Sequence, residues 1–291
     1  MKQKQTLSIV LPAKNEALNI GSVLQSLKKL HPEAEIIVVN DGSTDNTAEI
    51  ATNHGAKVLS HPYSQGNGAS IKTGARNATG EVIVFMDADG QHKPEDIPLL
   101  LNKLEEGYDM VVGARHNDTQ ASFVRKIGNG FYNRFASLMT GHKIEDLTSG
   151  FRAVRTNKFH KFLYLLPNGF SYPTTSTMAF FRSGFPVAYV PIHAGKREGS
   201  SHIKILKDGT RFFIIILKIG ALFSPMRLFL PISLGLFFSG LGLYGYTYTV
   251  EHRFTNMSAL LLSTSIITFL MGIISEQISS LHYKQTDDHT V

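Results

Sequence analysis

Two long apolar stretches near the C-terminal end constrain this chain more than any other feature. Leu228–Val250 contains no charged residue, and Met257–Ile278 contains only Glu276 near its end. A helix that crosses a bilayer needs roughly 20 apolar residues. Two such stretches, joined by the short segment Glu251–Asn256, predict a transmembrane helical hairpin. The alternative is a buried hairpin inside a large soluble domain, although neighbouring apolar stretches of this length are rare in soluble folds.

Charged residues around these stretches predict how the hairpin is oriented. Lys204–Phe223 mixes basic with aliphatic and aromatic residues at helical spacing, which is typical of an amphipathic helix in the membrane interface. Basic residues flank both stretches, so the positive-inside rule predicts cytosolic ends; they are Lys204, Lys207, Arg211, Lys218, Arg227 and Lys284. The N-terminal apolar run is too short for a signal peptide. We therefore expect a multi-pass protein of the cytoplasmic (inner) membrane whose N-terminal part is cytosolic.

Small residues in the first apolar stretch predict close helix packing. Gly235 and Ser239 are four positions apart, a spacing that lets two membrane helices approach each other. Packing of such hairpins also makes a homo-oligomer an expectation.

The N-terminal part alternates short apolar runs with stretches of helical spacing. The runs are near-continuously apolar, as in parallel strands covered on both faces; they are Leu7–Leu11, Glu35–Val39, Lys57–Leu59, Glu81–Met86 and Met110–Val112. The helical stretches between them are Ile20–Leu30, Thr44–His54, Ser70–Ala78 and Pro94–Glu106. We expect Ser43 or Thr44 to cap the second helix and Pro94 to lie in a first helical turn. Repeated strand–helix units predict a doubly wound, mostly parallel α/β sheet.

The pattern loosens after Gly113. Residues 114–130 read as a mobile basic loop that leads into a helix over Phe131–Met139. Further strands are expected near Phe151–Val154 and Val187–Val190, with helices near Lys158–Leu165 and Thr175–Arg182. The predicted domains are residues 1–203, an interfacial helix over 204–226, and the hairpin with its tail over 227–291.

Polar residues follow the predicted strands at the edge where doubly wound sheets bind ligands. The first strand leads into Pro12-Ala13-Lys14-Asn15-Glu16, and the second into Asn40-Asp41-Gly42-Ser43-Thr44-Asp45. An acid after a strand can accept hydrogen bonds from a ribose or a base, whereas turn and capping chemistry is the ordinary alternative. We favour ligand binding for Asp41 and the turn for Asp45.

Two carboxylates follow the strongly apolar fourth strand. Asp87 and Asp89 lie at i and i+2 in the segment Asp87-Ala88-Asp89-Gly90-Gln91-His92, so in extended chain they point to the same side. Such a pair can share a divalent cation, and Mg²⁺ or Mn²⁺ would take its remaining ligands from a diphosphate and water. The chain has no cysteine, which excludes thiolate metal sites and a cysteine nucleophile.

The formal net charge of +6 at pH 7 admits nucleic acid, a membrane surface or anionic substrates as partners. Because the basic residues crowd toward the apolar stretches, anionic lipid head groups account for them, and we expect no nucleic-acid partner.

Together these motifs resemble the family 2 glycosyltransferases with a GT-A fold, and most of all the dolichyl- and polyprenyl-phosphate sugar synthases such as the dolichyl-phosphate mannose synthases. The resemblance covers nearly the whole chain. Its motifs are Pro12–Glu16, the segment around Asp41, Asp87–His92, Asp146-Leu147-Thr148-Ser149-Gly150-Phe151-Arg152, and the basic segments Arg197–Lys204 and Ser224–Arg227.

The resemblance implies roles for individual residues. Pro12, Glu16, Asp41 and Asp87 would bind the nucleotide diphosphate sugar, and Asp87, Asp89 and Gln91 would hold Mg²⁺ or Mn²⁺. Arg115, Arg125 and Asn129 would bind the acceptor phosphate of undecaprenyl or dolichyl phosphate. Arg197 and Asp89 would act on the donor diphosphate, and Asp146 would lie close to the reacting atoms.

The expected reaction transfers a single hexose, from UDP-glucose, another UDP-sugar or GDP-mannose. A single in-line displacement inverts the anomeric centre and needs no enzyme nucleophile. A lipid phosphate is already mostly ionised at neutral pH, so a strong general base is not required. Asp146 is therefore either a general base or a residue that orients an arginine or the acceptor.

Three other functions compete with this interpretation. A dinucleotide-binding oxidoreductase would need a glycine-rich turn after the first strand, and Pro12–Glu16 contains no glycine. A processive polysaccharide synthase would carry a Q-x-x-R-W motif, and the chain has no tryptophan. A non-catalytic, membrane-tethered sugar-nucleotide-binding protein remains an alternative.

Overall fold

The structure is a computed structural model that describes residues 5–115, 123–169, 171–192, 217 and 220–287, with the side chains of 123–129, 131 and 282–287 excepted. The chain forms two compact units. The first comprises Met1–Arg134 and Lys143–Ile203, and the second comprises Phe135–His142 and Lys204–Val291. The predicted division at residues 203 and 226 stays a prediction, because most of the expected interfacial helix over 204–226 lies outside the described residues.

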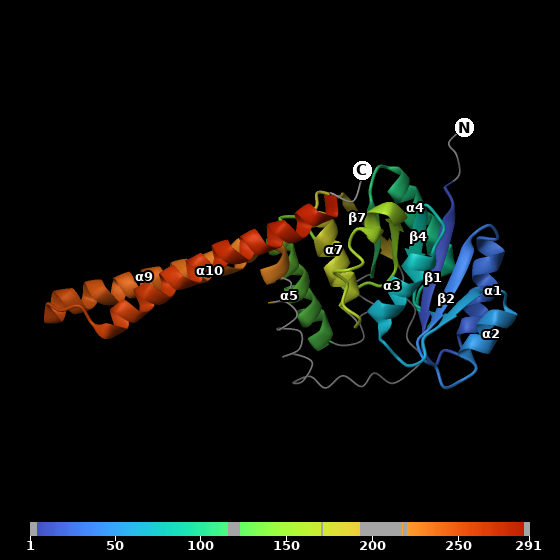
Figure 1. Ribbon diagram of the computed structural model, residues 1–291, viewed down its shortest axis with the longest axis horizontal. Coiled ribbons are helices and arrows are strands. Elements are labelled where there is room, and N and C mark those ends of the chain that lie inside the picture. The colour runs from blue at the N-terminus through green and yellow to red at the C-terminus, as the bar shows by residue number, and fades with distance from the viewer. Residues whose placement is uncertain (1–4, 116–122, 170, 193–216, 218–219, 288–291) are drawn as a thin grey trace. The chain divides into compact units, whose positions relative to one another are not determined.

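The first unit is built around a seven-stranded sheet (Figure 1). The strand order is β3-β2-β1-β4-β6-β5-β7, and β6 runs antiparallel to both of its neighbours whereas the other pairs are parallel. The strands are β1 Leu7–Ala13, β2 Glu35–Asn40, β3 Lys57–Ser60, β4 Val82–Phe85, β5 Met110–Arg115, β6 Arg152–Arg155 and β7 Val187–Ile192. The predicted mostly parallel α/β sheet is thus confirmed.

Helices cover both faces of the sheet. Residues of β1 alternate between the faces, so Ile9 and Leu11 pack with α1, α2 and α4, while Val10 contacts α3 at Gly74. This two-sided burial is the reason that the strands are apolar along their whole length. The helices of this unit are α1 Ile20–Leu30, α2 Thr47–Asn53, α3 Asn67–Asn77, the 3-10 turn η1 Pro94–Asp96, α4 Ile97–Glu105, α5 Phe123–Thr140, α6 Thr156–His160 and α7 Tyr172–Arg182.

Strand register brings three distant segments to one edge of the sheet. Arg152, the first residue of β6, pairs with Phe85 at the end of β4 and with Val112 in β5. The segment before β6 therefore meets the segments that follow β4 and β5. This is the edge at which the sequence placed its candidate ligand-binding residues.

Two local expectations were wrong. Residues 114–115 continue β5 and residues 123–130 belong to α5, so only 116–122, which lie outside the described residues, remain of the expected loop over 114–130. The second helix begins at Thr47, with neither Ser43 nor Thr44 as its cap; instead, an Asp45 oxygen accepts a hydrogen bond from the Thr47 N–H at 3.1 Å. Pro94 does lie in a first helical turn, as expected.

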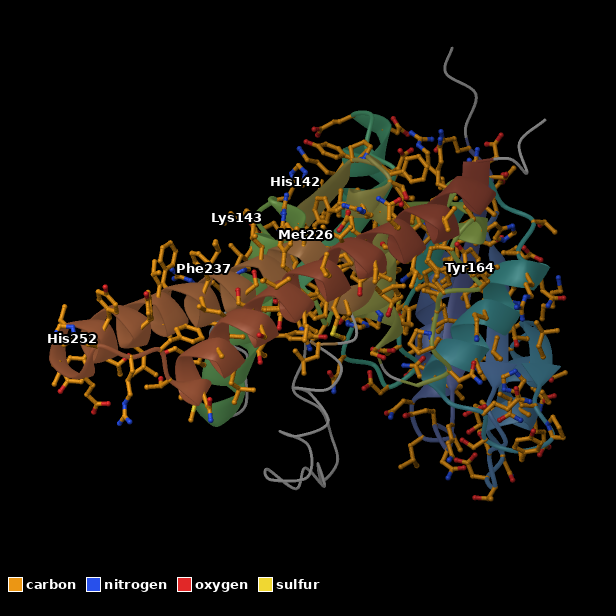
Figure 2. The ribbon with its side chains drawn as sticks, turned by 60° about the vertical axis from the view of Figure 1, so that its left-hand side comes forward. His142, Lys143, Tyr164, Met226, Phe237 and His252 are labelled. Atoms are coloured by element: carbon orange, nitrogen blue, oxygen red, sulfur yellow. The ribbon has the colours of Figure 1, made fainter. Side chains whose placement is uncertain are left out.

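The second unit contains the helical hairpin of α9 Pro225–Glu251 and α10 Asn256–Asp287. Pro225–Glu251 and Asn256–Leu281 are each long and apolar enough to cross a membrane. Only 11% and 17% of the residues in their most apolar windows are buried. Helices of a hairpin inside a soluble core would be mostly buried. Phe237 projects from the outer surface of α9, and His252 lies at the turn (Figure 2).

Small residues spaced seven apart form the contact between the two helices. On α10 they are Ser258, Ser265, Gly272 and Ser279, and on α9 they are Ser233, Gly240 and Thr247. Seven residues make two helical turns, so each set lines one side of its helix. The Ser265 hydroxyl donates to the Ser233 carbonyl across this seam at 2.9 Å. The predicted pair Gly235 and Ser239 is wrong, because both residues lie on the exposed side of α9.

We expect that Gly272→Leu will destabilise the hairpin. A Cβ at Gly272 would lie 2.9 Å from the Phe229 Cβ, so a larger side chain must push the helices apart, and overpacking typically costs about 1–3 kcal/mol. Gly235→Leu is the matched control, because a Cβ there meets nothing within 4 Å. Thermal unfolding in detergent, followed by circular dichroism, should show a lower midpoint for Gly272→Leu alone. Equal midpoints would contradict the seam.

The C-terminal end of α5 is capped within this second unit. Arg227 Nη1 donates to the Leu138 and Met139 carbonyls at 3.0 and 2.8 Å, and the Ser224 hydroxyl donates to the Met139 carbonyl at 2.7 Å. A cation at the last carbonyls of a helix also interacts favourably with the helix dipole. The motif Ser224–Arg227 thus begins α9 and ends α5.

Candidate functional site

The pair Asp87 and Asp89 lies in a tight turn after β4. The Asp87 N–H donates to Nδ1 of His92 at 3.3 Å, and the Gln91 N–H donates to an Asp89 oxygen at 3.1 Å. The buried His92 ring stacks on Phe151 with the ring centres 5.1 Å apart, which anchors the turn to the start of β6. The Asp87 side chain stays 37% exposed, so a carboxylate on a rigid turn faces solvent at the end of a buried strand.

The donor set of this turn fits a cation that keeps most of its ligands for substrate and water. Within the described residues, no three acidic or histidine side chains converge on one point. Mg²⁺ is commonly held by one or two carboxylates together with substrate phosphates, and the turn offers the Asp87 and Asp89 carboxylates and the Gln91 amide. That these residues bind a metal stays a prediction.

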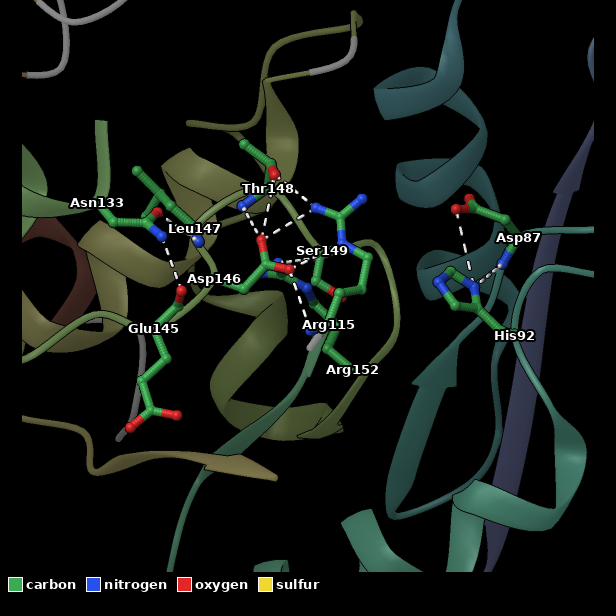
Figure 3. A network of polar contacts seen from close by, with 10 residues as sticks. All are labelled: Asp87, His92, Arg115, Asn133, Glu145, Asp146, Leu147, Thr148, Ser149 and Arg152. Atoms are coloured by element: carbon green, nitrogen blue, oxygen red, sulfur yellow. Dashed lines mark hydrogen bonds and ion pairs between the residues drawn. The ribbon is translucent and has the colours of Figure 1, made fainter. Parts of the chain in front are cut away.

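Arg115 and Asp146 form a bidentate ion pair at the same edge (Figure 3). Arg115, the last residue of β5, donates from Nε and Nη2 to the two Asp146 oxygens at 2.8 and 3.0 Å. Nη2 also donates to the Thr148 hydroxyl at 2.7 Å, and the Thr148 N–H donates to Asp146 at 3.1 Å. One edge of the guanidinium is therefore fixed in a plane by fork-to-fork geometry.

The other end of the Arg115 guanidinium is open. Within the described part of the chain Nη1 has no partner, and 29% of the side chain is exposed. Burial lowers the pKa of Arg115, but the charges of Asp146 and Asp87 raise it above its ordinary value. The result is a permanent, oriented cation beside Asp87 that presents free N–H groups, which is suited to a phosphate.

Asp146 is poorly suited to accept a proton. Its side chain is buried, and burial would raise the pKa of the carboxyl, but the bonds and charge of Arg115 and the Thr148 N–H hold that pKa below its ordinary value. A general base works best with a pKa near the operating pH. Of the two roles left open by the sequence, the geometry favours orientation of Arg115.

Three residues that support the site were given no role from the sequence. Asn133 of α5 brackets Asp146: its Nδ2 donates to the Glu145 carbonyl at 2.7 Å and its Oδ1 accepts from the Leu147 N–H at 3.1 Å. Thr148 bonds both members of the ion pair. Arg152 is fully buried at the start of β6. Thr148 and Arg152 lie within the motif Asp146–Arg152 quoted above, whereas no local pattern marks Asn133.

Asp41 lies at the end of β2, as expected, but its carboxylate is already fully engaged. One oxygen contacts His61 Nδ1 at 2.7 Å and accepts from the Gln65 N–H at 2.8 Å; the other accepts from the Ser64 hydroxyl at 2.8 Å and the Gly66 N–H at 2.9 Å. Burial raises the pKa of Asp41, but these bonds bring it below its ordinary value. A carboxylate has about four lone-pair sites, so none is left for a nucleotide. Nucleotide binding by Asp41 stays a prediction, and the geometry favours a role in holding the segment 61–66.

We expect Asp41→Asn to raise the KM for the nucleotide donor about tenfold while kcat changes little. An amide would place an NH₂ group against the main-chain N–H groups of Gln65 and Gly66, which loosens the segment beside the donor. A donor analogue methylated at N3 of the base tests direct contact. If Asp41 binds the base, methylation should weaken binding in the wild type but not in the variant; equal effects in both proteins identify a positioning role.

Of the other residues for which the sequence predicted a role, the structure describes Pro12 and Glu16 but not the side chains of Arg125, Asn129 and Arg197. Pro12 lies in β1 and pairs with Val39 of β2, and Glu16 begins the turn into α1, where its N–H donates to the Thr47 hydroxyl at 2.8 Å. Both lie at the carboxyl end of β1, where the Ala13 carbonyl accepts from the Asp41 N–H at 2.9 Å. The side chains of Arg125 and Asn129, and all of Arg197, lie outside the described residues, so their roles stay predictions.

Comparison with known proteins identifies the family of the chain. Residues 8–163 match the model of glycosyl transferase family 2, and residues 224–281 match the GtrB C-terminal hairpin. Undecaprenyl-phosphate 4-deoxy-4-formamido-L-arabinose transferase of Proteus mirabilis is 28% identical over 95% of this chain and 89% of its own. A dolichyl-phosphate hexose transferase of Haloferax volcanii is 30% identical over 73% of this chain and 93% of its own.

A solved structure shows the same fold. Glucosyl-3-phosphoglycerate synthase of Mycobacterium tuberculosis, in complex with Mn²⁺, UDP and phosphoglyceric acid, superimposes with a TM-score of 0.59 at 25% identity, over 73% of this chain and 77% of that one. The resemblance drawn from the motifs is thereby confirmed. The chain belongs to glycosyl transferase family 2 and is a glycosyltransferase.

Proposed function

We propose that this protein transfers a single hexose from a nucleotide diphosphate sugar to a polyprenyl phosphate at the cytosolic face of the cytoplasmic membrane. The observation that carries the proposal is the half-open Arg115 guanidinium, clamped by Asp146 beside the Asp87 turn. It offers a phosphate-binding group next to the carboxylates that would serve the donor diphosphate.

The reaction is a single displacement at the anomeric carbon. A phosphate oxygen of the lipid forms the new bond, the bond to the donor diphosphate breaks, and its electron pair leaves with the nucleoside diphosphate. The lipid phosphate, with a second pKa near 6, needs little help to lose its proton. Arg115 orients it, and no residue of the site has to act as a nucleophile. The anomeric centre is therefore inverted.

The part of the site that binds the donor would also hold a divalent cation. Held by Asp87 and Asp89, with Gln91 beside them, Mg²⁺ or Mn²⁺ would supply positive charge to the departing diphosphate. The relatives support this, because the Mycobacterium tuberculosis synthase was crystallised with Mn²⁺ and UDP. On the same basis we favour a UDP-sugar over GDP-mannose as the donor.

The hairpin and the named relatives support the proposed class of acceptor. Two enzymes with names that specify undecaprenyl phosphate or dolichyl phosphate match most of this chain. An apolar hairpin of membrane-spanning length would keep the enzyme where a polyprenyl tail resides. The basic residues that flank the apolar stretches support cytosolic ends and a multi-pass topology.

A transfer assay tests the proposal. The full chain in detergent is incubated with radiolabelled UDP-glucose, other UDP-sugars and GDP-mannose, each with undecaprenyl or dolichyl phosphate and with Mn²⁺ or Mg²⁺. We expect one donor to give a lipid phosphate carrying one sugar of inverted configuration, and chelation of the cation to abolish the product. Configuration is read by NMR of the released sugar phosphate.

Two outcomes would overturn the proposal in favour of the other functions. Binding of a nucleotide sugar without transfer to either lipid would identify a membrane-tethered sugar-nucleotide-binding protein. A product with many sugars would identify a relative of the processive polysaccharide synthases.

A further inference from the structure

Arg152 is a fully buried cation that pairs with no carboxylate of the described segments. Its side chain is 0% exposed, and within the described residues no carboxylate lies within ion-pair distance of it. In the part of the chain that the structure describes, its Nε has no hydrogen-bond partner. Burial of an unpaired charge costs several kcal/mol, so a guanidinium here does not serve stability by itself.

Neutral groups hold the guanidinium in place. Nη1 donates to the Pro173 carbonyl at 3.0 Å and to the hydroxyls of Ser176 and Thr177 at 2.8 and 3.2 Å, all at the start of α7. Nη2 donates to the Ser149 carbonyl. The Tyr172 ring also lies 5.7 Å from the guanidinium carbon. All of these groups are neutral, so they keep the guanidinium fixed without cancelling its charge.

The carboxylates of the site act on this cation through their charge. Burial lowers the pKa of Arg152, and the charges of Asp146 and Asp87 act in the opposite direction. β6 lies between β4 and β5, and Arg152 pairs with Phe85, two positions before Asp87. Figure 3 shows Arg152 in the same network as Ser149, whose carbonyl it holds, together with Asp146 and Arg115.

The bonds of Arg152 also fix the main chain that faces Asp87. Arg152 holds the Ser149 carbonyl, and the Tyr172 hydroxyl donates to the Gly150 carbonyl at 3.2 Å. A Cβ at Gly150 would lie only 3.1 Å from an Asp87 oxygen, so the main chain at Gly150 packs directly against the Asp87 carboxylate. The cation and the carboxylate are thus held on opposite sides of one short, rigid segment.

We propose that Arg152 is a positioning residue for the donor diphosphate, a fixed positive charge beneath Asp87 that favours anions at the site and offsets the carboxylates around it. In a poorly polarisable interior such a charge attracts an anion without touching it, and no protein group has to reorient when the anion binds. The inference deepens the proposed function and rests on it. Its distinguishing consequence is that loss of the charge changes the affinities for cations and anions in opposite directions.

The test uses the full chain in detergent, with Mn²⁺ alone and UDP alone as separate probes. We expect Arg152→Met to bind Mn²⁺ about threefold more tightly or better, and UDP about threefold more weakly or worse, by calorimetry. Turnover with the donor found in the transfer assay should fall at least tenfold. Arg152→Lys, which keeps the charge, should restore both affinities toward the wild type.

Controls separate charge from structure. Thr177→Val removes one hydrogen bond to Arg152 without changing the charge, and should leave both affinities unchanged. If Arg152→Met does not fold by circular dichroism, Arg152→Gln provides a neutral, hydrogen-bonding substitute with the same expected shifts. Affinities for Mn²⁺ and UDP that weaken together, or a lysine variant as impaired as the methionine variant, would overturn the inference. A wild type that binds neither probe would overturn the proposed function as well.

Discussion

Asp89→Ala should lower sugar transfer at least a hundredfold. The substitution removes one of the two carboxylates available to a cation at the end of β4, and loss of electrostatic stabilisation of a leaving group costs about 10²–10³ in rate. Because the Asp89 side chain also accepts from the Gln91 N–H, the turn itself should loosen. The measurements are kcat with saturating UDP-sugar and lipid phosphate, and Mn²⁺ affinity by calorimetry.

Glu95→Ala is the matched control for this prediction. Glu95 is an exposed carboxylate in η1, a few residues further along the chain, and it contacts none of the site residues described above. Its removal should leave turnover and Mn²⁺ affinity at the wild-type level. Undiminished transfer by Asp89→Ala would remove the basis for a metal-assisted mechanism at this turn.

Asp146→Ala should lower kcat/KM for the lipid phosphate about a hundredfold. Without its partner, the Arg115 guanidinium loses both bonds that set its plane, and a misplaced phosphate-binding group costs roughly 10²-fold. Asp146→Asn keeps one oxygen for Arg115 and should lose only about tenfold. Glu145→Ala is the control, since among the described residues the Glu145 side chain pairs only with the exposed Lys143.

The pH dependence distinguishes positioning from base catalysis by Asp146. The folded-state pKa lies below the unfolded value of about 3.9, so the stability from the ion pair is present above that pH and is lost as pH falls through the folded pKa. The difference in unfolding midpoint between wild type and Asp146→Asn should therefore be constant from about pH 5 to 8 and shrink below about pH 4. A general base would instead give the wild type an acidic limb in its rate profile that Asp146→Asn lacks, together with equal losses for the two variants.

The sheet was predictable because its strands carry a strong local signal. β1, β2 and β4 are buried on both faces, which requires the continuous apolar runs that the sequence shows. Helix α1 was predicted at its observed bounds because Ile20, Val23, Leu24 and Leu27 repeat at helical spacing. The membrane-length helices were predicted by length and absence of charge alone.

What escaped prediction depends on contacts between distant segments. The strand over residues 152–155 was expected, but no local pattern places it between β4 and β5, and that placement is what brings Asp146 to Arg115. The acceptor sites of the Asp41 carboxylate are occupied because residues 61–66 fold over it, and no local pattern predicts that contact. The contact between the hairpin helices was predicted at the wrong residues, because Gly235 and Ser239 suggested small residues four positions apart. The observed small residues at the contact are seven positions apart.

β6 is synthesised after β5 but lies between β4 and β5 in the sheet, so the order of synthesis on the ribosome matters for this site. A nascent chain that has emerged only as far as β5 lacks the strand that separates β5 from β4, and Arg115 has no carboxylate to hold it. The part of the sheet formed by β1, β2 and β3 can assemble at that stage because its pairings are complete. The proposed binding of a lipid phosphate by Arg115 therefore becomes possible only after Asp146 and β6 have been made, before the apolar helices α9 and α10 are translated.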